Sequence, residues 1–173
     1  YRNDEALERL GGIADLFLLH DRDIDTRCDV SVARVIAGAP AVLRRSRGHV
    51  PHGIAAPGFF DEPVLACGAL LKNTFCVGAA GMAHLGPHIG DLENVETFEA
   101  YEHAIARMER FVGVRPAVIA HDLHPDYLST RYALARTGAA RIAVQHHHAH
   151  ICAAMAEHGM AGPVIGVAYD GTG

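Results

Sequence analysis

The sequence lacks several features that mark whole classes of protein. Its four cysteines are scattered without CxxC spacing, so neither a zinc knuckle nor a disulfide framework is indicated, and buried thiols in a reducing compartment are expected. No apolar run approaches the roughly 18 residues that a membrane span needs, and no signal peptide is recognisable. These absences predict a cytoplasmic protein with no membrane partner.

The composition and the net charge argue against a disordered protein and against a nucleic-acid-binding protein. Low-complexity tracts are absent, and of the 173 residues 50% are hydrophobic and 20% charged, as in ordinary globular proteins. The formal net charge of -5 argues against non-specific nucleic-acid binding, so no nucleic-acid partner is expected. The chain is long enough to bury a sizeable core, but its length leaves the number of domains open.

Both ends of the sequence resemble the interior of a longer protein. The chain starts without Met in a helix-to-strand unit, with the strand expected at 14–20, and it stops on a loop after an apolar strand expected at 164–170. Three prolines and two glycines fall within residues 50–63, and such a cluster is typical of a domain boundary. We therefore expect an internal fragment in two parts, residues 1–60 and residues 61–173.

The order of the expected elements predicts the fold class. Three short apolar segments separated by turn residues between positions 64 and 90 suggest an antiparallel meander. Hydrophobic periodicity then predicts alternating helices and strands, at 94–113, 117–123, 128–137, 141–147 and 149–159.

Three strands followed by helix, strand, helix, strand and helix is the order of the ribonuclease-H-like fold, which builds each lobe of the actin and sugar-kinase-like superfamily. The predicted class is therefore α/β, with a mixed sheet in the second part and an α+β tail in the first. The strand expected at 164–170 would begin a second lobe.

Four histidines fall within the five residues "HHHAH", 146–150. His146 and His150 are four apart, so in a helix that begins near position 146 they lie on one face and could share a metal ion. The cluster follows an expected strand, where α/β sheets bind ligands. For each histidine alone, a solvated or structural role is the alternative. Asp170 ends an apolar strand expected beside the one before His146, and it could supply the carboxylate that completes a metal site.

A glycine-rich turn follows Asp170. Gly171, Thr172 and Gly173 could form a tight turn whose backbone amides face a phosphate. Taken alone, the segment is more simply an Asp-Gly turn without a ligand. Together with the histidines it indicates a site for both metal and phosphate.

The first part of the chain concentrates donors for an anion. Arg44, Arg45 and Arg47 surround Ser46, and guanidinium groups can hold a phosphate or carboxylate through two hydrogen bonds each. A charge run is as often a solvated face, and composition leaves both interpretations open. Further donors that would suit an anionic nucleotide are His20, Arg22, Ser31 and Arg34.

The stretch "HDLHPDYLST" directly follows an expected strand. Asp122, His124 and Asp126 could therefore line a loop of the site. A turn and helix cap is the simpler interpretation, and it is the one we favour from the sequence.

These stretches together resemble the HypF family, the carbamoyltransferases of nickel-iron hydrogenase maturation. "LLHDRDIDTRCDVSVAR" and "LRRSRGHVP" are similar to the end of its YrdC-like domain. "LKNTFC", "HIGDLENVET", "HDLHPDYLSTRYA", "VQHHHAH" and "DGTG" are similar, in family order, to the start of its threonylcarbamoyl-transferase-like domain. The likeness runs from residue 16 to the last residue.

The resemblance implies a two-step reaction. The YrdC-like domain would make carbamoyl-adenylate from carbamoyl phosphate and ATP, with Mg, and the next domain would pass the carbamoyl group to the C-terminal cysteine thiolate of a HypE-type partner protein. Carbamoyl on sulfur is then dehydrated to the cyanide ligand of the iron.

The resemblance also implies roles for residues. His146, His150 and Asp170 match the family's metal site, for which zinc or iron is expected, and catalytic roles are assigned to His147 and Lys72. The family pattern has two aspartates before the serine near position 30, whereas this sequence has Asp29, Val30 and Ser31. The ligand set of that loop therefore departs from the family.

Two other interpretations remain open from the sequence. Antibiotic O-carbamoyltransferases and the tRNA threonylcarbamoyl-transfer enzymes share this domain type, although "HDLHPDYLSTRYA" and the domain order favour the hydrogenase family. A metal- and nucleotide-binding regulatory module without chemistry is the alternative of another class. Turnover of carbamoyl phosphate distinguishes an enzyme from such a module.

Overall fold

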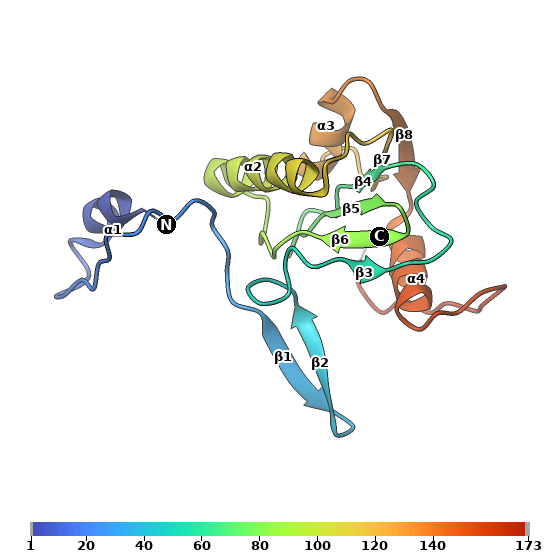
Figure 1. Ribbon diagram of the computed structural model, residues 1–173, viewed down its shortest axis with the longest axis horizontal. Helices are drawn as coiled ribbons and strands as arrows, with labels where there is room; N and C mark the ends of the chain where they lie inside the picture. The colour runs from blue at the N-terminus through green and yellow to red at the C-terminus, as the bar shows by residue number, and fades with distance from the viewer. Residues whose placement is uncertain (1, 172–173) are drawn as a thin grey trace.

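A six-stranded mixed sheet is the centre of the computed structural model, which describes residues 2–171 (Figure 1). Three helices accompany the sheet, and α1 together with a separate two-stranded hairpin precedes it in the chain. The strands of the sheet are β3 (Ile54–Ala55), β4 (Val64–Ala66), β5 (Cys76–Ala79), β6 (Met82–Leu85), β7 (Val118–Asp122) and β8 (Ala140–Val144). The remaining elements are α1 (Asn3–Leu10), β1 (Val32–Ile36), β2 (Ala39–Arg44), α2 (Val95–Val112), α3 (Leu128–Ala135) and α4 (His146–Glu157).

The strand order of the sheet is β3-β6-β5-β4-β7-β8. The β4, β5 and β6 strands form an antiparallel meander, whereas β4, β7 and β8 run parallel. Counted from β4, this is the ribonuclease-H-like order 3-2-1-4-5, with β3 added at the edge beside β6. The predicted α/β class with a mixed sheet is therefore confirmed.

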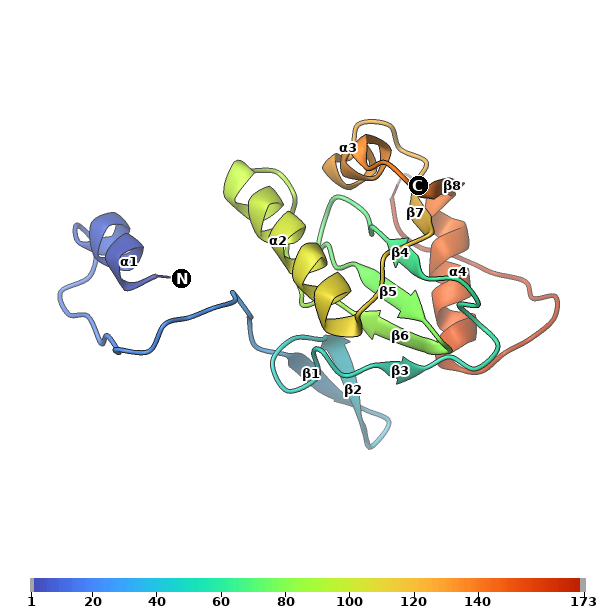
Figure 2. The same ribbon diagram turned by 45° about the horizontal axis from the view of Figure 1, so that its top comes forward.

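The hydrophobic core lies between the sheet and the helices α2 and α3. Tyr101, Ile105 and Met108 recur at helical spacing on α2 and are at most 4% exposed. They belong to one buried cluster with Leu65 of β4 and Ile119 of β7. Helix α4 contributes no fully buried residue and lies on the other side of the sheet (Figure 2).

The ends of α2 are specified by local sequence. The Asn94 side chain accepts a hydrogen bond of 2.8 Å from the Thr97 amide and so caps the first turn. Gly113 ends the helix in the left-handed region at φ 75°, which a residue with a Cβ rarely adopts. Periodicity and both caps thus explain why the helix predicted here is confirmed.

Two predicted strands are wrong. Residues 14–20 and 164–170 form no strand, and Leu16, Leu18 and Ile165 are 88%, 99% and 98% exposed. A strand needs a neighbour for its backbone hydrogen bonds, and among residues 2–171 neither segment pairs with another. The second lobe expected to begin at 164–170 is therefore not seen there.

The segment expected to separate the two parts contributes to the sheet. Ile54 and Ala55 of β3 pair antiparallel with β6. The hairpin of β1 and β2 forms its own two-stranded sheet. The division near residue 60 remains a prediction. Within the described residues, no helix is both long enough and apolar enough to cross a membrane.

Tyr101 ties the core to the loop after β4. It is fully buried, and its hydroxyl donates a 2.9 Å hydrogen bond to the Cys67 carbonyl. Burial raises the pKa of Tyr101 far above its usual range, so the phenol keeps its proton and remains a donor. The Cys67 carbonyl also accepts a hydrogen bond from the side-chain NH2 group of the buried Asn73.

Replacing Tyr101 with Phe should lower the free energy of unfolding by about 1 kcal/mol, because one net hydrogen bond is lost while Cys67 keeps its other donor. Tyr101→Ala should remove about 3–5 kcal/mol through the cavity it leaves. Urea unfolding measures both. Phe111→Ala is the control, since Phe111 on the same helix is 61% exposed and its loss should change stability by at most about 0.5 kcal/mol. Equal stability of Tyr101→Ala and Phe111→Ala would contradict this account of the core.

Candidate metal-binding site

Two neighbouring parallel strands bring the polar side chains of the site to one edge of the sheet. Asp122 is the last residue of β7 and stands opposite Val144, the last residue of β8. Gln145 follows, and its side chain accepts a 2.8 Å hydrogen bond from the His148 amide, which caps the start of α4. The strand expected at 141–147 therefore ends at Val144, and the helix begins at His146.

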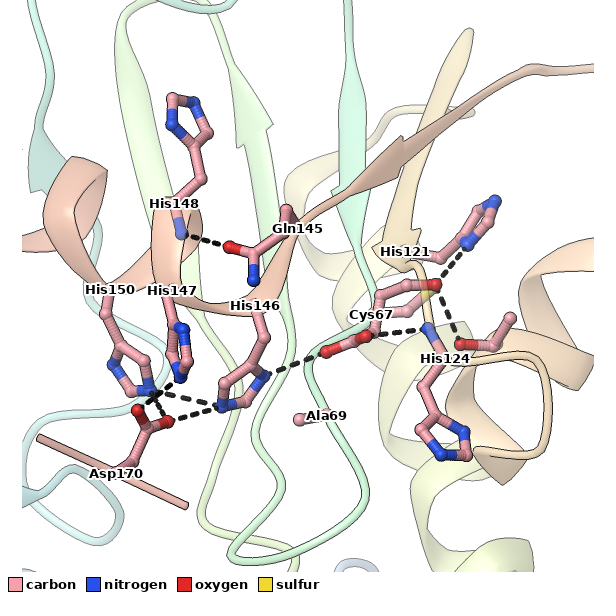
Figure 3. A network of polar contacts seen from close by, with 12 residues as sticks. Cys67, Ala69, His121, His124, Gln145, His146, His147, His148, His150 and Asp170 are labelled. Atoms are coloured by element: carbon pink, nitrogen blue, oxygen red, sulfur yellow. Dashed lines mark hydrogen bonds and ion pairs between the residues drawn. The ribbon is translucent and has the colours of Figure 1, made fainter. Parts of the chain in front are cut away.

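Three side chains converge at the start of α4 (Figure 3). The Nε2 atoms of His146 and His150 lie 3.0 and 3.1 Å from the same carboxylate oxygen, Oδ2 of Asp170, and 3.2 Å from each other. Two ligand atoms on one ion with bonds of about 2.1 Å are separated by roughly 3.0–3.4 Å at octahedral to tetrahedral angles. The donor set and its spacing thus fit a divalent metal ion. All three residues predicted as metal ligands are brought together.

The charges in the cluster favour an ionised carboxylate. Partial desolvation raises the pKa of Asp170, but a backbone hydrogen bond and the nearby His147, His150 and His146 lower it, so that the pKa lies below its usual range. A carboxylate and two imidazole nitrogens that face one point form a ligand set suited to zinc or iron.

His147 faces the other oxygen of the same carboxylate. Its Nε2 lies 2.6 Å from Asp170 Oδ1, although the angles are not those of a hydrogen bond, and this buried nitrogen has no hydrogen-bond partner among residues 2–171. His147 also lines a cavity of about 460 Å³ between α4 and the segment 164–168, together with Ile151 and Met155. It is therefore adjacent to the cluster, as a catalytic residue would be.

Lys72 lies in the turn between β4 and β5, with a positive φ of 49°. Its backbone amide donates a 2.7 Å hydrogen bond to Asp91 Oδ1, and its side chain is exposed. No contact within the described residues joins it to the histidines. The catalytic roles of His147 and Lys72 remain predictions. Gly171 after Asp170 is exposed, and Thr172 and Gly173 lie outside the described residues.

The two serines predicted to bind nucleotide form hydrogen bonds within the protein, between the basic loop and the segment before β1. Ser46 is fully buried, and its amide donates a 2.8 Å hydrogen bond to Ser31 Oγ. The Ser31 hydroxyl in turn donates to the Arg47 carbonyl at 2.9 Å. These contacts hold the basic loop against the segment before β1.

The arginines of this loop differ in their surroundings. Arg44 is exposed, Arg47 reaches the Cys28 carbonyl at 3.4 Å, and Arg45 has a buried Nε without a partner in the described chain. Arg34 is exposed on β1. No described contact joins His20 or Arg22 to this loop, and the carbonyl of His20 accepts a hydrogen bond from Asn3. The predicted anion donors are therefore only partly brought together.

Asp122 belongs to the surroundings of the cluster, although its sequence context alone favours a turn and helix cap. Its Oδ1 does accept a 2.8 Å hydrogen bond from the His124 amide, as the favoured turn implies. Its Oδ2, however, lies 2.9 Å from Nδ1 of His146, so Asp122 adjoins the cluster directly. The signal was available in principle, because the carboxyl ends of adjacent parallel strands meet at the same edge of a sheet.

Comparison with known proteins places the chain among characterised sequences. A sequence profile described as the HypF Kae1-like domain matches residues 60–157. The chain is 50% identical over 180 residues to the carbamoyltransferase HypF2 of Cupriavidus necator, covering 99% of this chain and 22% of the relative. It is 44% identical over 172 residues to the carbamoyltransferase HypF of Synechocystis sp., again covering 99% of this chain and 22% of the relative.

Solved structures agree with these relatives. The crystal structure of a full-length HypF in its phosphate- and nucleotide-bound form superposes with a TM-score of 0.92 at 47% identity, covering 98% of this chain and 27% of that one. For the HypF of T. kodakarensis the TM-score is 0.83 at 40% identity, covering 92% of this chain and 21% of that one. This chain spans 22% of the length of the two curated relatives named above. The resemblance recognised in the sequence is thereby confirmed, and the chain belongs to the HypF family.

Proposed function

We propose that this chain is part of an enzyme that transfers a carbamoyl group, and that the transfer takes place at the cluster of His146, His150 and Asp170. The observation that carries the proposal is the convergence of two imidazole nitrogens and one carboxylate oxygen, 3.0 to 3.2 Å apart, at the carboxyl edge of the sheet. Relatives at 50% and 44% identity are named carbamoyltransferases, which supports this reaction class.

In the proposed organisation, residues 1–60 end a YrdC-like domain and residues 61–173 begin the carbamoyl-transfer domain. The separate β1–β2 sheet and the start of the family match at residue 60 support the division. The first domain would convert carbamoyl phosphate, water and ATP with Mg into carbamoyl-adenylate, pyrophosphate and phosphate. A related crystal structure is described as phosphate- and nucleotide-bound, in agreement with such substrates.

The second domain would pass the carbamoyl group to the C-terminal cysteine thiolate of a HypE-type partner. That thiolate forms the new bond to the carbamoyl carbon, and AMP departs with the electron pair of the bond that breaks. The product on sulfur is the precursor of the cyanide ligand in nickel-iron hydrogenase maturation. We propose a cytoplasmic setting for this reaction.

The three-residue cluster suits a catalytic metal better than a closed structural one. A bound zinc or iron ion would act as a Lewis acid that polarises the carbamoyl oxygen and favours the departure of AMP through its phosphate group. Among residues 2–171 the cluster offers three ligand atoms, whereas a closed structural zinc site has four. The His150 side chain is 56% exposed, so substrate can approach from that side. His147 lies beside Asp170, where it could hold or orient the carbamoyl group.

Replacing His146 or His150 with Ala should remove the metal from the full-length protein, because the loss of a protein ligand costs more binding free energy than a water restores. The measurement is the metal content of each purified variant. His148→Ala is the matched control, since His148 lies on the same helix and contacts Cys152 instead of the cluster. Full metal occupancy in both His146→Ala and His150→Ala would rule out the site.

The basic loop is proposed to hold carbamoyl-adenylate or its phosphates through Arg44, Arg45 and Arg47. Replacing each with Ala should slow adenylate formation by roughly 10- to 100-fold, since a hydrogen bond to a charged group contributes about 1.5–3 kcal/mol. Replacing an arginine with Lys should restore little of this activity, because an ammonium group cannot form the two parallel hydrogen bonds of a planar guanidinium. Carbamoyl-phosphate-dependent exchange of pyrophosphate into ATP is the assay, and Arg115→Ala is an exposed control. Unchanged exchange in all three Ala variants would contradict an anion-binding role and show that the arginines only face solvent.

The two half-reactions should separate by mutation. His146→Ala and His150→Ala should form adenylate but fail to carbamoylate the acceptor thiol, whereas the arginine variants should fail in both steps. Added carbamoyl-adenylate should restore transfer to the arginine variants alone. Normal transfer by the histidine variants would contradict a catalytic cluster, and a full-length protein that never turns over carbamoyl phosphate would instead be a regulatory module.

A further inference from the structure

We infer that Asp122 is a positioning residue that fixes the tautomer and the ring orientation of His146. The inference rests on the proposed metal site, because it concerns how one ligand of that site is held. A carboxylate behind a metal-binding histidine is a recurrent arrangement that raises the basicity of the ligand and fixes its direction.

Each carboxylate oxygen of Asp122 contacts a different partner. Oδ2 lies 2.9 Å from Nδ1 of His146, and Oδ1 accepts a 2.8 Å hydrogen bond from the His124 amide. The Asp122 side chain is 9% exposed, so water competes little for these contacts. The plane of the carboxylate is therefore set by the turn that follows β7.

The backbone of Asp122 is equally fixed. Its carbonyl accepts a hydrogen bond from the Thr130 hydroxyl at 3.1 Å and lies 2.8 Å from Nδ1 of His121. Parallel pairing across β7 and β8 sets Asp122 opposite Val144, two residues before His146. The carboxylate thus has a rigid position, and the imidazole ring adapts to it.

The chemical consequence lies in the proton of the imidazole. A carboxylate that faces an imidazole nitrogen accepts its hydrogen bond, so with an ion at Nε2 the hydrogen of His146 would reside on Nδ1 and donate to Asp122. The Nε2 lone pair then points at Asp170 Oδ2 and at Nε2 of His150, where an ion would bind. The other tautomer would direct an N–H bond at the ion. Within residues 2–171, His150 has no corresponding carboxylate behind its Nδ1, so the two histidines are not equivalent.

The test is Asp122→Asn in the full-length protein. The Asn oxygen can still accept from the His124 amide, while its NH2 group faces His146 Nδ1 and favours the tautomer with hydrogen on Nε2. Zinc affinity measured by chelator competition should fall by roughly 10- to 100-fold. The unfolding midpoint of the metal-free protein should change little. If Asp122→Asn cannot be purified folded, Asp122→Glu keeps the charge but displaces the carboxylate, and the same loss of affinity is expected.

Two control variants separate positioning from general destabilisation. Asp126→Asn removes a carboxylate in the same loop that pairs with the exposed Arg131 at 3.0 Å, and it should bind zinc as wild type does. Tyr101→Phe removes a buried hydrogen bond on α2 away from Asp122, and it should lower the unfolding midpoint without changing zinc affinity.

The outcomes distinguish this inference from the proposed function. Loss of affinity in Asp122→Asn and His146→Ala, with both controls unchanged, supports positioning. Wild-type affinity in Asp122→Asn beside a loss in His146→Ala overturns the positioning role and leaves the metal site intact. Wild-type affinity in His146→Ala overturns the metal site and the inference together. An equal loss of affinity in Tyr101→Phe would show that the effect of Asp122→Asn is a general loss of stability.

Discussion

The parallel pairing of β7 with β8 is the constraint on which the site depends. Its register runs from Val118 opposite Ala140 to Asp122 opposite Val144, so both strands end at the same level. One strand delivers a carboxylate at its last residue, and the other delivers a helix that starts two residues later with His146. A register shift of one residue would turn Asp122 to the opposite face of the sheet and separate it from His146.

The cluster concentrates groups that would repel or leave each other unsatisfied without a positive charge between them. A carboxylate oxygen and two imidazole nitrogens meet within 3.2 Å, and one of the imidazoles is held from behind by a second carboxylate. Such an arrangement is stable when a proton or a cation neutralises it. The neutralising charge is needed only at the start of α4, so the core beneath can remain apolar. Tyr101 and its neighbours supply the rigid base.

Local features of this chain were predictable from the sequence, and nonlocal ones were less so. The α2 helix follows from its periodicity, Asn94 and Gly113, and the shared face of His146 and His150 follows from their spacing of four residues. The strands expected at 14–20 and 164–170 failed because an apolar run specifies a strand only where a partner strand exists. The contact between Asp122 and His146 depends on strand order and register, which no single segment encodes. The family itself was recognisable because several separated motifs occur in order.

The unequal support of the two histidines has a kinetic consequence. His146 is 22% exposed and held from behind, whereas His150 is 56% exposed and contacts only the cluster among the described residues. Rotation of His150 away from the cluster requires no movement of the sheet, and exposed side chains change rotamer within picoseconds to nanoseconds. Of the residues that would hold an ion, His150 would therefore be the one that releases it first. His146, held from behind by Asp122, would stay in place.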